Sequence, residues 1–206
     1  MTIVIADKSH CIYADIICQT IAESASVRGT GIAKRTPEYV IKKIENGNAV
    51  IALDGDKFVG FCYIETWGHG KFVANSGLIV HPDYRGQGVA KQIKHKVFQL
   101  SRTKYPEAKV FSITTGLAVM KMNTELGYKP VPFSELTDDQ SFWDGCQSCK
   151  NYDVLQRTEQ RLCLCTGMLY DPKVQEKDEP KKVVKPKVFN RLKSIKEKMF
   201  LKKERS

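Results

Sequence analysis

The stretch from Leu78 to Phe98, LIVHPDYRGQGVAKQIKHKVF, constrains the fold more than any other part of the sequence. A short apolar run is followed by a proline, then by an arginine and two glycines within four residues, and then by an amphipathic segment. Gly86 and Gly88 can adopt positive φ angles and let a ligand approach the backbone closely. The helix that follows offers unpaired N–H groups and the positive end of its dipole. The pattern predicts a strand, a glycine turn and a helix whose first turn binds a phosphate-bearing ligand.

The segments on either side of this stretch predict a mixed α/β fold. Apolar periodicity and turn residues predict strands at 2–6, 49–53, 58–67, 72–80, 109–115 and 128–133, and helices at 11–25, 37–46, 87–102 and 118–126. The order is β-α-α-β-β-β-α-β-α-β, an antiparallel meander followed by β-α-β. It indicates a mixed sheet with helices on both faces, and it differs from the order of a Rossmann fold.

The net charge of +10 lies mostly at the C-terminal end of the chain. Residues 173–206 contain 13 Lys and Arg against 5 Asp and Glu, whereas residues 1–172 contain 20 against 18. The tail predicts a charged linker and then a basic amphipathic helix, with one stripe made of Val188, Leu192, Ile195 and Met199. Such a helix can contact an anionic membrane, RNA, a partner protein or its own domain, and a solvated tail is the simpler alternative. No motif favours nucleic acid in particular.

The cysteine content and the N-terminus predict a cytoplasmic protein. The chain has seven cysteines, an odd number, and its first residues lack the basic region and apolar core of a signal peptide. No run of eighteen apolar residues is present, so the sequence predicts no transmembrane helix.

In this order of elements, the sequence resembles the GCN5-related N-acetyltransferases, the GNAT superfamily. The resemblance rests on the strand LIV, on Arg85, Gly88 and Ala90 in the spacing R-x-x-G-x-A, on the helix after them, and on LGYKPV at 126–131. It covers residues 1–133. It implies the GNAT fold and the transfer of an acyl group from acetyl-CoA or succinyl-CoA to an amine.

The resemblance also implies roles for individual residues. The glycine turn would bind the pyrophosphate of acyl-CoA, and the strand before it would splay from its neighbour and pair with the pantetheine arm. The N–H of Leu78 would stabilise the oxyanion that forms on the thioester, an interaction worth ~3 kcal/mol in a transition state. The amine would attack the thioester directly, without an acyl-enzyme. The implied acyl-CoA residues are Leu78, Ile79, Val80, Arg85, Gly86, Gln87, Gly88, Val89 and Ala90.

Two groups that many members of this family use for proton transfer are missing. The glutamate found four residues before the Leu78 position is replaced by Ala74, and the tyrosine found four residues before the last glycine is replaced by Asn123. Glu65 can also be a solvent-facing carboxylate on a strand with no catalytic role, so the sequence leaves the identity of the general base open. The candidates for base and acid are Glu65 and Tyr128, with His69, Ser76 and a bound water as alternatives.

The loop SVRGTGIAKRTPEY, residues 26–39, bears on the acceptor, because in this family it walls the acceptor pocket. Arginine binds carboxylates through two parallel hydrogen bonds, so Arg28 and Arg35 predict a small carboxylate-bearing amine, such as an amino acid. A solvated basic loop is the alternative. Together with the cysteine-rich region, this loop is similar to the stand-alone, N-acetylglutamate synthase-like acyltransferases of arginine biosynthesis. That looser resemblance implies glutamate as the acceptor.

Four cysteines form two close pairs, Cys146 with Cys149 and Cys163 with Cys165, thirteen residues apart. Four thiolates in two pairs can hold a structural zinc ion, although C-x-C is tighter than the usual zinc knuckle. The segment LCLCTGMLY alternates like a strand, so its two cysteines would point to one face. Buried apolar cysteines, or a redox pair at Cys146 and Cys149, are the alternatives to zinc.

The sequence as a whole predicts three parts: a GNAT core at 1–133, a cysteine-rich extension at 134–172 and a basic tail at 173–206. The predicted function is an acyl-CoA-dependent N-acyltransferase. The alternatives are a non-catalytic acyl-CoA-binding adaptor that acts through its tail, and an acyltransferase for protein lysines.

Overall fold

A computed structural model of the chain describes residues 1–28 and 34–178. Residues 1–173 form one compact unit. The amphipathic helix expected at 188–199 lies outside the described residues. So does the side chain of Arg28, although its backbone forms the last position of a helix.

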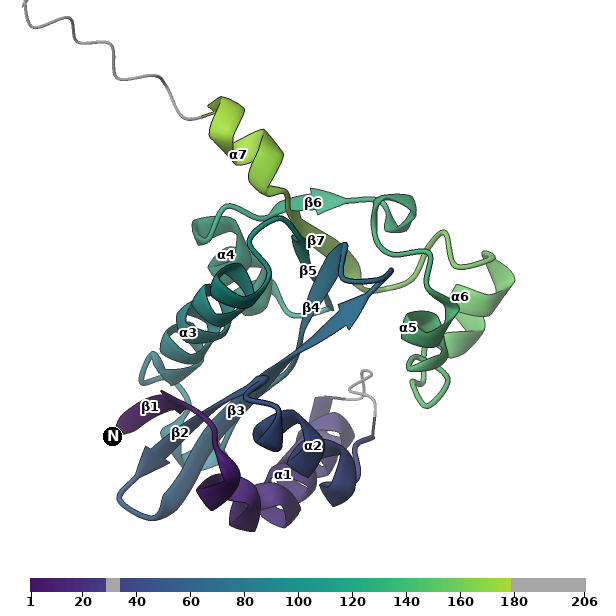
Figure 1. Cartoon of the computed structure of the whole chain (residues 1–206). Helices are drawn as coiled ribbons and strands as arrows, with labels where there is room; N and C mark the ends of the chain where they lie inside the picture. Colours follow the sequence, from purple (N-terminus) through teal and green to yellow (C-terminus); the bar gives the residue numbers. More distant parts are fainter. Residues whose placement is uncertain (29–33, 179–206) are drawn as a thin grey trace, which may run out of the picture. The chain divides into compact units, whose positions relative to one another are not determined.

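The unit is built on a seven-stranded mixed sheet, in the order β1-β2-β3-β4-β5-β7-β6 (Figure 1). All neighbouring strands are antiparallel except β4 and β5. This confirms the predicted mixed sheet. The strands are β1 (Thr2–Ile5), β2 (Ala49–Asp54), β3 (Lys57–Trp67), β4 (Phe72–Val80), β5 (Lys109–Thr114), β6 (Lys129–Val131) and β7 (Thr166–Tyr170).

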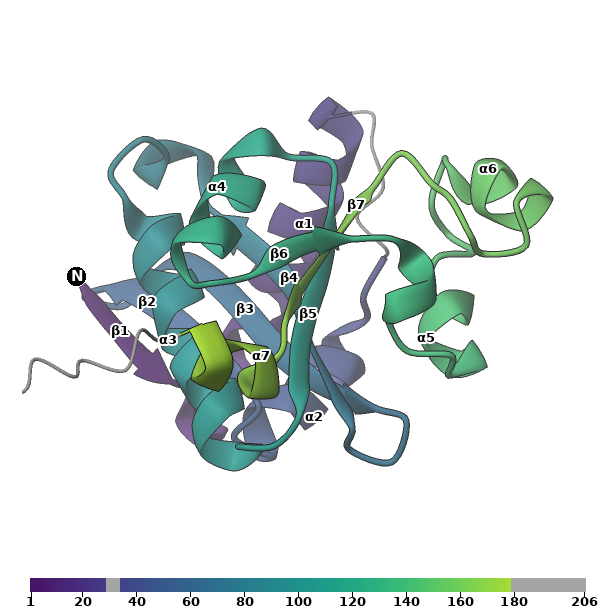
Figure 2. The same cartoon turned by 90° about the horizontal axis from the view of Figure 1, so that it is seen from above.

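Helices cover both faces of the sheet, as the sequence predicts (Figures 1 and 2). We call the side on which α3 packs the α3 face and the opposite side the α1/α2 face. The α-helices are α1 (Ala14–Arg28), α2 (Pro37–Glu45), α3 (Val89–Lys104), α4 (Leu117–Glu125), α5 (Gln140–Asp144), α6 (Tyr152–Arg157) and α7 (Pro172–Asp178), with short 3-10 turns at Lys8–Tyr13, Pro82–Tyr84 and Phe133–Glu135.

The alternation of buried side chains along β3 decides which residues reach each face. Cys62 and Ile64 are fully buried against α3, in a core that also contains Val97. Phe61 and Tyr63 are fully buried on the opposite side, in the core formed with α1 and α2. The same alternation places Glu65 on the α1/α2 face.

The sheet continues beyond the strand that the sequence analysis takes as the last one. β7 inserts between β5 and β6, and pairs with both in antiparallel register. The sheet core therefore extends past residue 133 and includes the segment TGMLY, whose alternation is that of a strand. Residues 134–165 form an insertion between two strands of the same sheet, and we call this segment the insertion.

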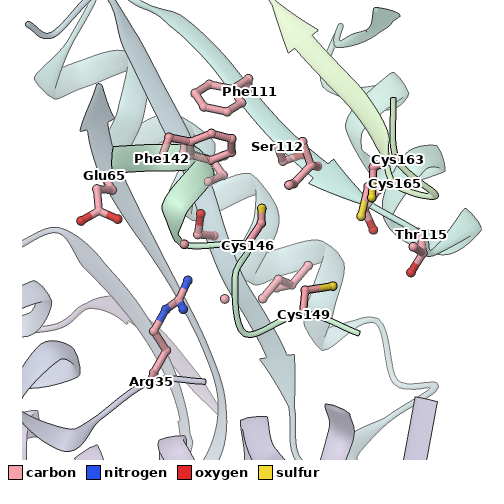
Figure 3. Close-up of a pocket in the computed structure, with 18 of the residues that line it drawn as sticks. Arg35, Glu65, Phe111, Ser112, Thr115, Phe142, Cys146, Cys149, Cys163 and Cys165 are labelled. Carbon is pink, nitrogen blue, oxygen red and sulfur yellow. The ribbon is translucent and has the colours of Figure 1, made fainter. Parts of the chain in front are cut away.

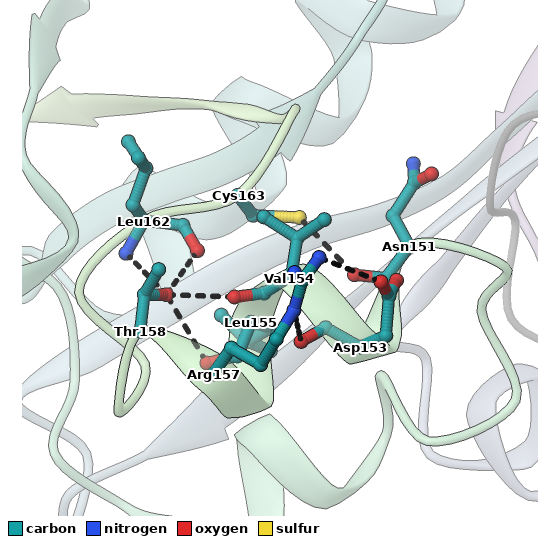
Figure 4. Close-up of polar contacts among 8 residues, drawn as sticks. All are labelled: Asn151, Asp153, Val154, Leu155, Arg157, Thr158, Leu162 and Cys163. Carbon is teal, nitrogen blue, oxygen red and sulfur yellow. Dashed lines mark hydrogen bonds and ion pairs between the residues drawn. The ribbon is translucent and has the colours of Figure 1, made fainter.

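The insertion is held together largely by its own polar contacts (Figure 4). The Thr158 hydroxyl donates to the carbonyl oxygen of Leu162 at 2.7 Å and accepts from its backbone N–H at 3.2 Å, which closes the turn after α6. Trp143 of α5 is buried and donates from Nε1 to the carbonyl of Thr137 at 2.9 Å. Trp143 also belongs to one buried cluster with Phe111 of β5 and Leu169 of β7, and this packing fixes the small insertion to the sheet core.

Strands β4 and β5 pair only over a short distance. Their parallel register runs from Phe72 opposite Lys109 to Ala74 opposite Phe111, and no further pairs follow. Residues 75–78 of β4 and 112–114 of β5 then lie apart, and we call the space between them the sheet opening. A bulge in β4 adds to the separation, because residues 77 and 78 together oppose the single residue Cys62 of β3.

Gly77 allows this bulge to form. Its φ angle is +67°, and a Cβ atom added there would lie 2.5 Å from Cε1 of Tyr63. Both the backbone conformation and the close approach of the ring require glycine.

We expect Gly77→Ala to destabilise the protein more than Gly70→Ala does. Gly70 lies in the β3–β4 connection with φ +82°, and a Cβ there meets no atom within 4 Å. Gly70→Ala should cost about 1 kcal/mol of unfolding free energy from backbone strain alone, whereas Gly77→Ala should cost about 1–3 kcal/mol more because the Tyr63 ring must move. Urea unfolding measures both variants, and equal losses would contradict this role of Gly77.

Candidate functional site

A cavity of about 480 Å³ lies at the sheet opening. It is lined by Asn75, Ser76, Gly77 and Leu78 of β4 and by Ser112, Ile113 and Thr114 of β5. The other lining residues come from β3, α1, α2 and the loop before α2, from α3, from α4 and the turn before it, and from Phe133 and the insertion, with one more residue each from β4 and β5. Because side chains from both faces of the sheet line one cavity, the cavity passes through the sheet at the point where two strands separate.

On the α1/α2 face, aromatic and charged side chains form one connected group. Arg35 donates from Nε to the Tyr63 hydroxyl at 2.7 Å, and its guanidinium lies 5.2 Å from the centre of the Tyr39 ring. Tyr39 donates in turn to Glu65 at 2.6 Å, and Glu65 forms an ion pair with Lys43. Burial raises the pKa of the Tyr39 hydroxyl, which therefore stays protonated as a donor to Glu65.

The guanidinium group of Arg35 faces the cavity (Figure 3). Its side chain is half-buried and points toward the insertion (Figure 3). In the part of the chain that the structure describes, Arg35 forms no ion pair with a carboxylate, and its bonded partners are the Tyr63 hydroxyl and the Lys34 carbonyl. A half-buried guanidinium with neutral partners favours an anionic ligand.

The insertion supplies an apolar wall to the same cavity. Phe142 of α5 packs at 5.0 Å between ring centres against Phe111 of β5 and at 5.6 Å against Trp67 of β3. All three side chains line the cavity, and Figure 3 shows Phe111, Phe142 and Cys146 one after another along its wall. The cavity thus has a cationic side near Arg35 and an apolar side under the insertion.

All four cysteines of the predicted cluster line this cavity. Burial raises the pKa of the Cys146 thiol to about 11, and burial together with the neighbouring Cys163 raises that of Cys165 to about 12. Cys163 and Cys165 lie side by side, and Cys146 and Cys149 lie apart from that pair (Figure 3). Among residues 1–28 and 34–178, no group of three or more His, Cys, Asp or Glu side chains is arranged to hold a metal ion. The predicted zinc site is therefore not supported.

On the α3 face, a buried polar group reaches the cavity. Lys94 of α3 is 2% exposed and lines the cavity. Its Nζ donates to Oδ1 of Asn75 at 3.2 Å, and the same oxygen accepts from the Tyr128 hydroxyl at 2.9 Å. Asn75 donates from Nδ2 to the Ser101 hydroxyl at 2.8 Å. Tyr128 is itself 1% exposed, does not line the cavity, and reaches it only through Asn75.

The glycine turn before α3 has the geometry of a phosphate site. Gly86 and Gly88 have φ angles of +78° and +77°, and a Cβ at either position would meet open space. In the described residues no backbone acceptor is found for the N–H groups of Gly86, Gln87 and Gly88. The Arg85 side chain is engaged elsewhere, since it donates to the Val80 carbonyl at 3.1 Å and to the Ser24 hydroxyl at 2.9 Å. The backbone of this turn, together with the first turn of α3, therefore fits an anionic phosphate.

The predicted site residues are only partly brought together. Leu78, Ser76, Glu65 and Arg35 line the cavity, whereas Tyr128 lies behind it. His69 lies in the β3–β4 connection with φ +55°, and it does not line the cavity.

Sequence reasoning missed Lys94, Tyr39 and Tyr63. The position of Lys94 contains a usable signal, because it falls between Ile93 and Val97 on the buried side of α3, where a lysine is unusual. No local pattern marks the two tyrosines, whose contacts join residues far apart in the chain.

The model of the acetyltransferase (GNAT) family matches residues 18–123, just over half of the chain. The chain belongs to the GNAT acetyltransferase family. GNAT enzymes take their acetyl group from acetyl-CoA, so this protein is an acetyl-CoA-dependent acetyltransferase. The comparison with curated proteins gives no match.

Solved structures of GNAT proteins share the fold at low sequence identity. N-acetylglutamate synthase from Neisseria gonorrhoeae, in complex with coenzyme A and N-acetylglutamate, is similar with a TM-score of 0.60 at 15% identity. The match covers 82% of this chain but 34% of the synthase, so the chain spans about a third of that protein.

Two further structures match over nearly their whole length. Rv2747 from Mycobacterium tuberculosis, in complex with CoA and a ligand designated NLQ, has a TM-score of 0.59 at 17% identity, covering 83% of this chain and 99% of that one. YncA from Salmonella typhimurium, with its cofactor acetyl-CoA, has a TM-score of 0.56 at 17% identity, covering 84% and 94%. At these identities the matches show the common fold.

No helix within residues 1–28 and 34–178 has the length and apolar character needed to cross a membrane.

We expect the Cys146 and Cys165 thiols to react slowly with iodoacetamide. Raised pKa values reduce the thiolate fraction at pH 8, and the greater nucleophilicity of a more basic thiolate offsets only part of that loss. Labelling should be at least about 10-fold slower than that of N-acetylcysteine amide, and should accelerate as the pH rises toward 11. Peptide mass spectrometry measures both rates. Labelling as fast as that of the small thiol would contradict the burial of these side chains.

Proposed function

We propose that this GNAT enzyme acetylates the amine of a small carboxylate-bearing acceptor, with glutamate as the leading candidate. The observation that carries the proposal is Arg35, a half-buried guanidinium that lines the cavity and forms no ion pair in the described residues. Lys43 is neutralised by Glu65, whereas Arg35 forms no ion pair among the described residues. An acceptor carboxylate would supply the missing anion.

The size of the cavity supports a small acceptor. The insertion lies over the α1/α2 side of the sheet opening and contributes Phe142, Cys146 and Leu155 to the wall. A volume of about 480 Å³ is within the ordinary range of small-molecule sites. A lysine of a folded protein would have to enter past the insertion, so the proposal favours a free amino acid over a protein acceptor.

The backbone of β4 is proposed to hold the reacting thioester. Leu78 belongs to the bulge with Gly77, so it has no one-to-one register partner in β3, and it lies beyond the residues of β4 that pair with β5. Its N–H group would donate to the thioester carbonyl oxygen and stabilise the negative charge that develops there. The backbone N–H groups of the glycine turn and of the first turn of α3 would hold the phosphates. Acetyl-CoA would supply the activated acetyl group, with succinyl-CoA as the alternative donor to be tested.

Glu65 is proposed as the base that accepts the proton of the attacking amine, directly or through a water. Glu65 lies directly opposite Ala74 in the β3–β4 register, and Ala74 holds the position where many members of the family have a glutamate. Residues opposite one another in an antiparallel pair project from the same face, with Cβ atoms about 5 Å apart. The carboxylate of Glu65 can therefore reach the region that a glutamate at position 74 would occupy. Tyr39 and Lys43 hold it in position.

The functional division of the chain is also a proposal. Residues 1–133 would bind acyl-CoA and provide the reacting groups, and residues 134–172 would close the acceptor side of the cavity and complete the sheet. The basic residues 173–206 would act apart from the chemistry.

We expect Arg35→Met to raise the KM for glutamate by about 10- to 100-fold while kcat changes little, because a charge-assisted hydrogen bond to the acceptor is lost. The measurement is thiol release from acetyl-CoA and from succinyl-CoA, against glutamate, glutamine, isoglutamine and other amino acids. The difference in KM between the wild type and Arg35→Met should disappear with one of the two amides, glutamine or isoglutamine, namely the one that lacks the carboxylate bound by Arg35. Arg157→Ala, on the exposed surface of the insertion, is the control. Equal KM values for wild type and Arg35→Met with every acceptor would contradict the proposal.

We expect Glu65→Gln to lower kcat by about 10²- to 10⁴-fold, the usual contribution of a general base. Lys43→Met tests whether this loss reflects the carboxylate or only its ion pair, since that variant keeps Glu65. The same kcat loss in both variants would indicate a positioning role for the ion pair and would count against Glu65 as the base.

A further inference from the structure

Lys94 is a buried titratable group that lines the cavity and to which the proposed function gives no role. It belongs to the apolar side of α3, between Ile93 and Val97, and is 2% exposed. Burying an ammonium group is costly unless it is paired with an anion or serves a function. In the described parts of the chain its partners are neutral: the Asn75 amide oxygen at 3.2 Å and the Tyr128 ring, 5.0 Å away at its centre.

The position of Lys94 in the cavity suggests what that function is. Lys94 lines the cavity on the α3 face, and Glu65 and Arg35 line it on the α1/α2 face. The phosphate-binding turn leads into α3, so a ligand bound there enters the sheet opening from the side of Lys94. The acceptor amine and the leaving thiol would then lie at opposite ends of the cavity, with the Leu78 N–H between them.

The position where many family members have a tyrosine acid is occupied by Asn123. Asn123 is fully buried and donates from Nδ2 to the Ser112 hydroxyl at 2.8 Å, and its Oδ1 has no hydrogen-bond partner among the described residues. A side-chain amide has no proton to give to a thiolate at ordinary pH. The α3 face therefore needs another acid, and Lys94 is the cavity-lining group there that can lose a proton.

We propose that Lys94 is the general acid that protonates the departing CoA thiolate, an inference that rests on the proposed binding of the thioester in the sheet opening. The amine nitrogen forms a bond to the thioester carbon, and the carbon–sulfur bond breaks with its electron pair on sulfur. Nζ of Lys94 gives one proton to that sulfur and becomes a neutral amine. The proton lost by the acceptor nitrogen passes to Glu65 or water, and Lys94 is reprotonated from solvent.

The acidity of the buried ammonium suits this step. Burial lowers the pKa of Lys94 to about 8. An ordinary thiol has a pKa of about 8.5, so transfer from Nζ to the thiolate is close to balanced. The groups that face Nζ are the Cys62 thiol from β3, Asn75 from β4 and the Tyr128 ring from the turn after α4. A Cys62 thiolate would raise the pKa of Lys94, but burial raises the pKa of the Cys62 thiol to about 11, so this thiol is neutral near pH 8.

Removal of the ammonium should leave the fold intact. The Asn75 oxygen also accepts from Tyr128, so Lys94→Met leaves no buried acceptor without a donor. Methionine fills a similar volume without a buried charge, so the unfolding free energy should be unchanged or higher. A purely structural role for Lys94 predicts the opposite, namely a less stable protein.

The first test is steady-state kinetics at saturating acetyl-CoA as a function of pH. We expect Lys94→Met to lower kcat about 10²- to 10⁴-fold. In the wild type, kcat should fall above pH about 8, as the ammonium loses its proton, and this falling limb should be absent in Lys94→Met. Lys94→Arg keeps the charge but cannot release a proton, so it should not restore the rate. Lys121→Met, at an exposed position of α4, is the control.

The second test needs no acceptor and so separates this inference from the proposed function. The pKa of the thiol of bound CoA is measured by the ultraviolet absorbance of the thiolate. A nearby ammonium should make it about one to three pH units lower in the wild type than in Lys94→Met. An equal thiol pKa in the two proteins, or a variant that unfolds more easily and keeps the wild-type pH profile, would overturn the role of Lys94. A CoA thiol pKa that is lower in the wild type than in Lys94→Met, together with no turnover on any acceptor, would support the role of Lys94 and contradict the proposed acceptor class.

Discussion

The separation of β4 from β5 is the constraint on which the rest of the structure depends. Parallel pairing holds the two strands together from Phe72 to Ala74, and the bulge at Gly77 shifts the register of β4 against β3 by one residue. The sheet is therefore open at its centre while its remaining strand pairs stay closed. An opening in the middle of a sheet leaves unpaired backbone groups, which a ligand with its own amide groups can satisfy.

The two ends of the cavity differ in charge and in origin. The α1/α2 face has an unpaired guanidinium, an ion-paired carboxylate and two tyrosines, all held by contacts between α2, its preceding loop and β3. The α3 face has one buried ammonium among neutral groups. This asymmetry supports the proposed assignment of the acceptor to one side and of the leaving thiol to the other.

The sequence predicts the fold well because its signals are local. The glycines of the turn at 85–88, the alternation along β3 and the amphipathic α3 each determine their own conformation. The strand β7 and the zinc site show the limits. Residues 166–170 alternate like a strand, but their place between β5 and β6 depends on pairing with residues far away in the chain. The spacing of the four cysteines fits a metal site, whereas in the described part of the fold no three of them are arranged to hold a metal ion.

The candidate site is predictable only where the backbone provides the function. Leu78 and the glycine turn follow from the pattern of strand, turn and helix. The side chains that distinguish this protein, Arg35, Glu65 and Lys94, come from three elements and meet only in the folded chain. Lys94 alone stands out in the sequence, as a charged residue on an apolar helix face, and its significance depends on the cavity it reaches.

A crystal structure of the protein with acetyl-CoA would test the central claim most directly, which is that the cavity through the sheet holds the thioester between two chemically different ends. The account predicts the thioester carbonyl oxygen within hydrogen-bonding distance of the Leu78 N–H, the sulfur on the side of Lys94, and the acetyl group directed toward Glu65 and Arg35. An acetyl-CoA molecule bound outside the sheet opening, or one whose sulfur lies on the side of Arg35, would contradict it.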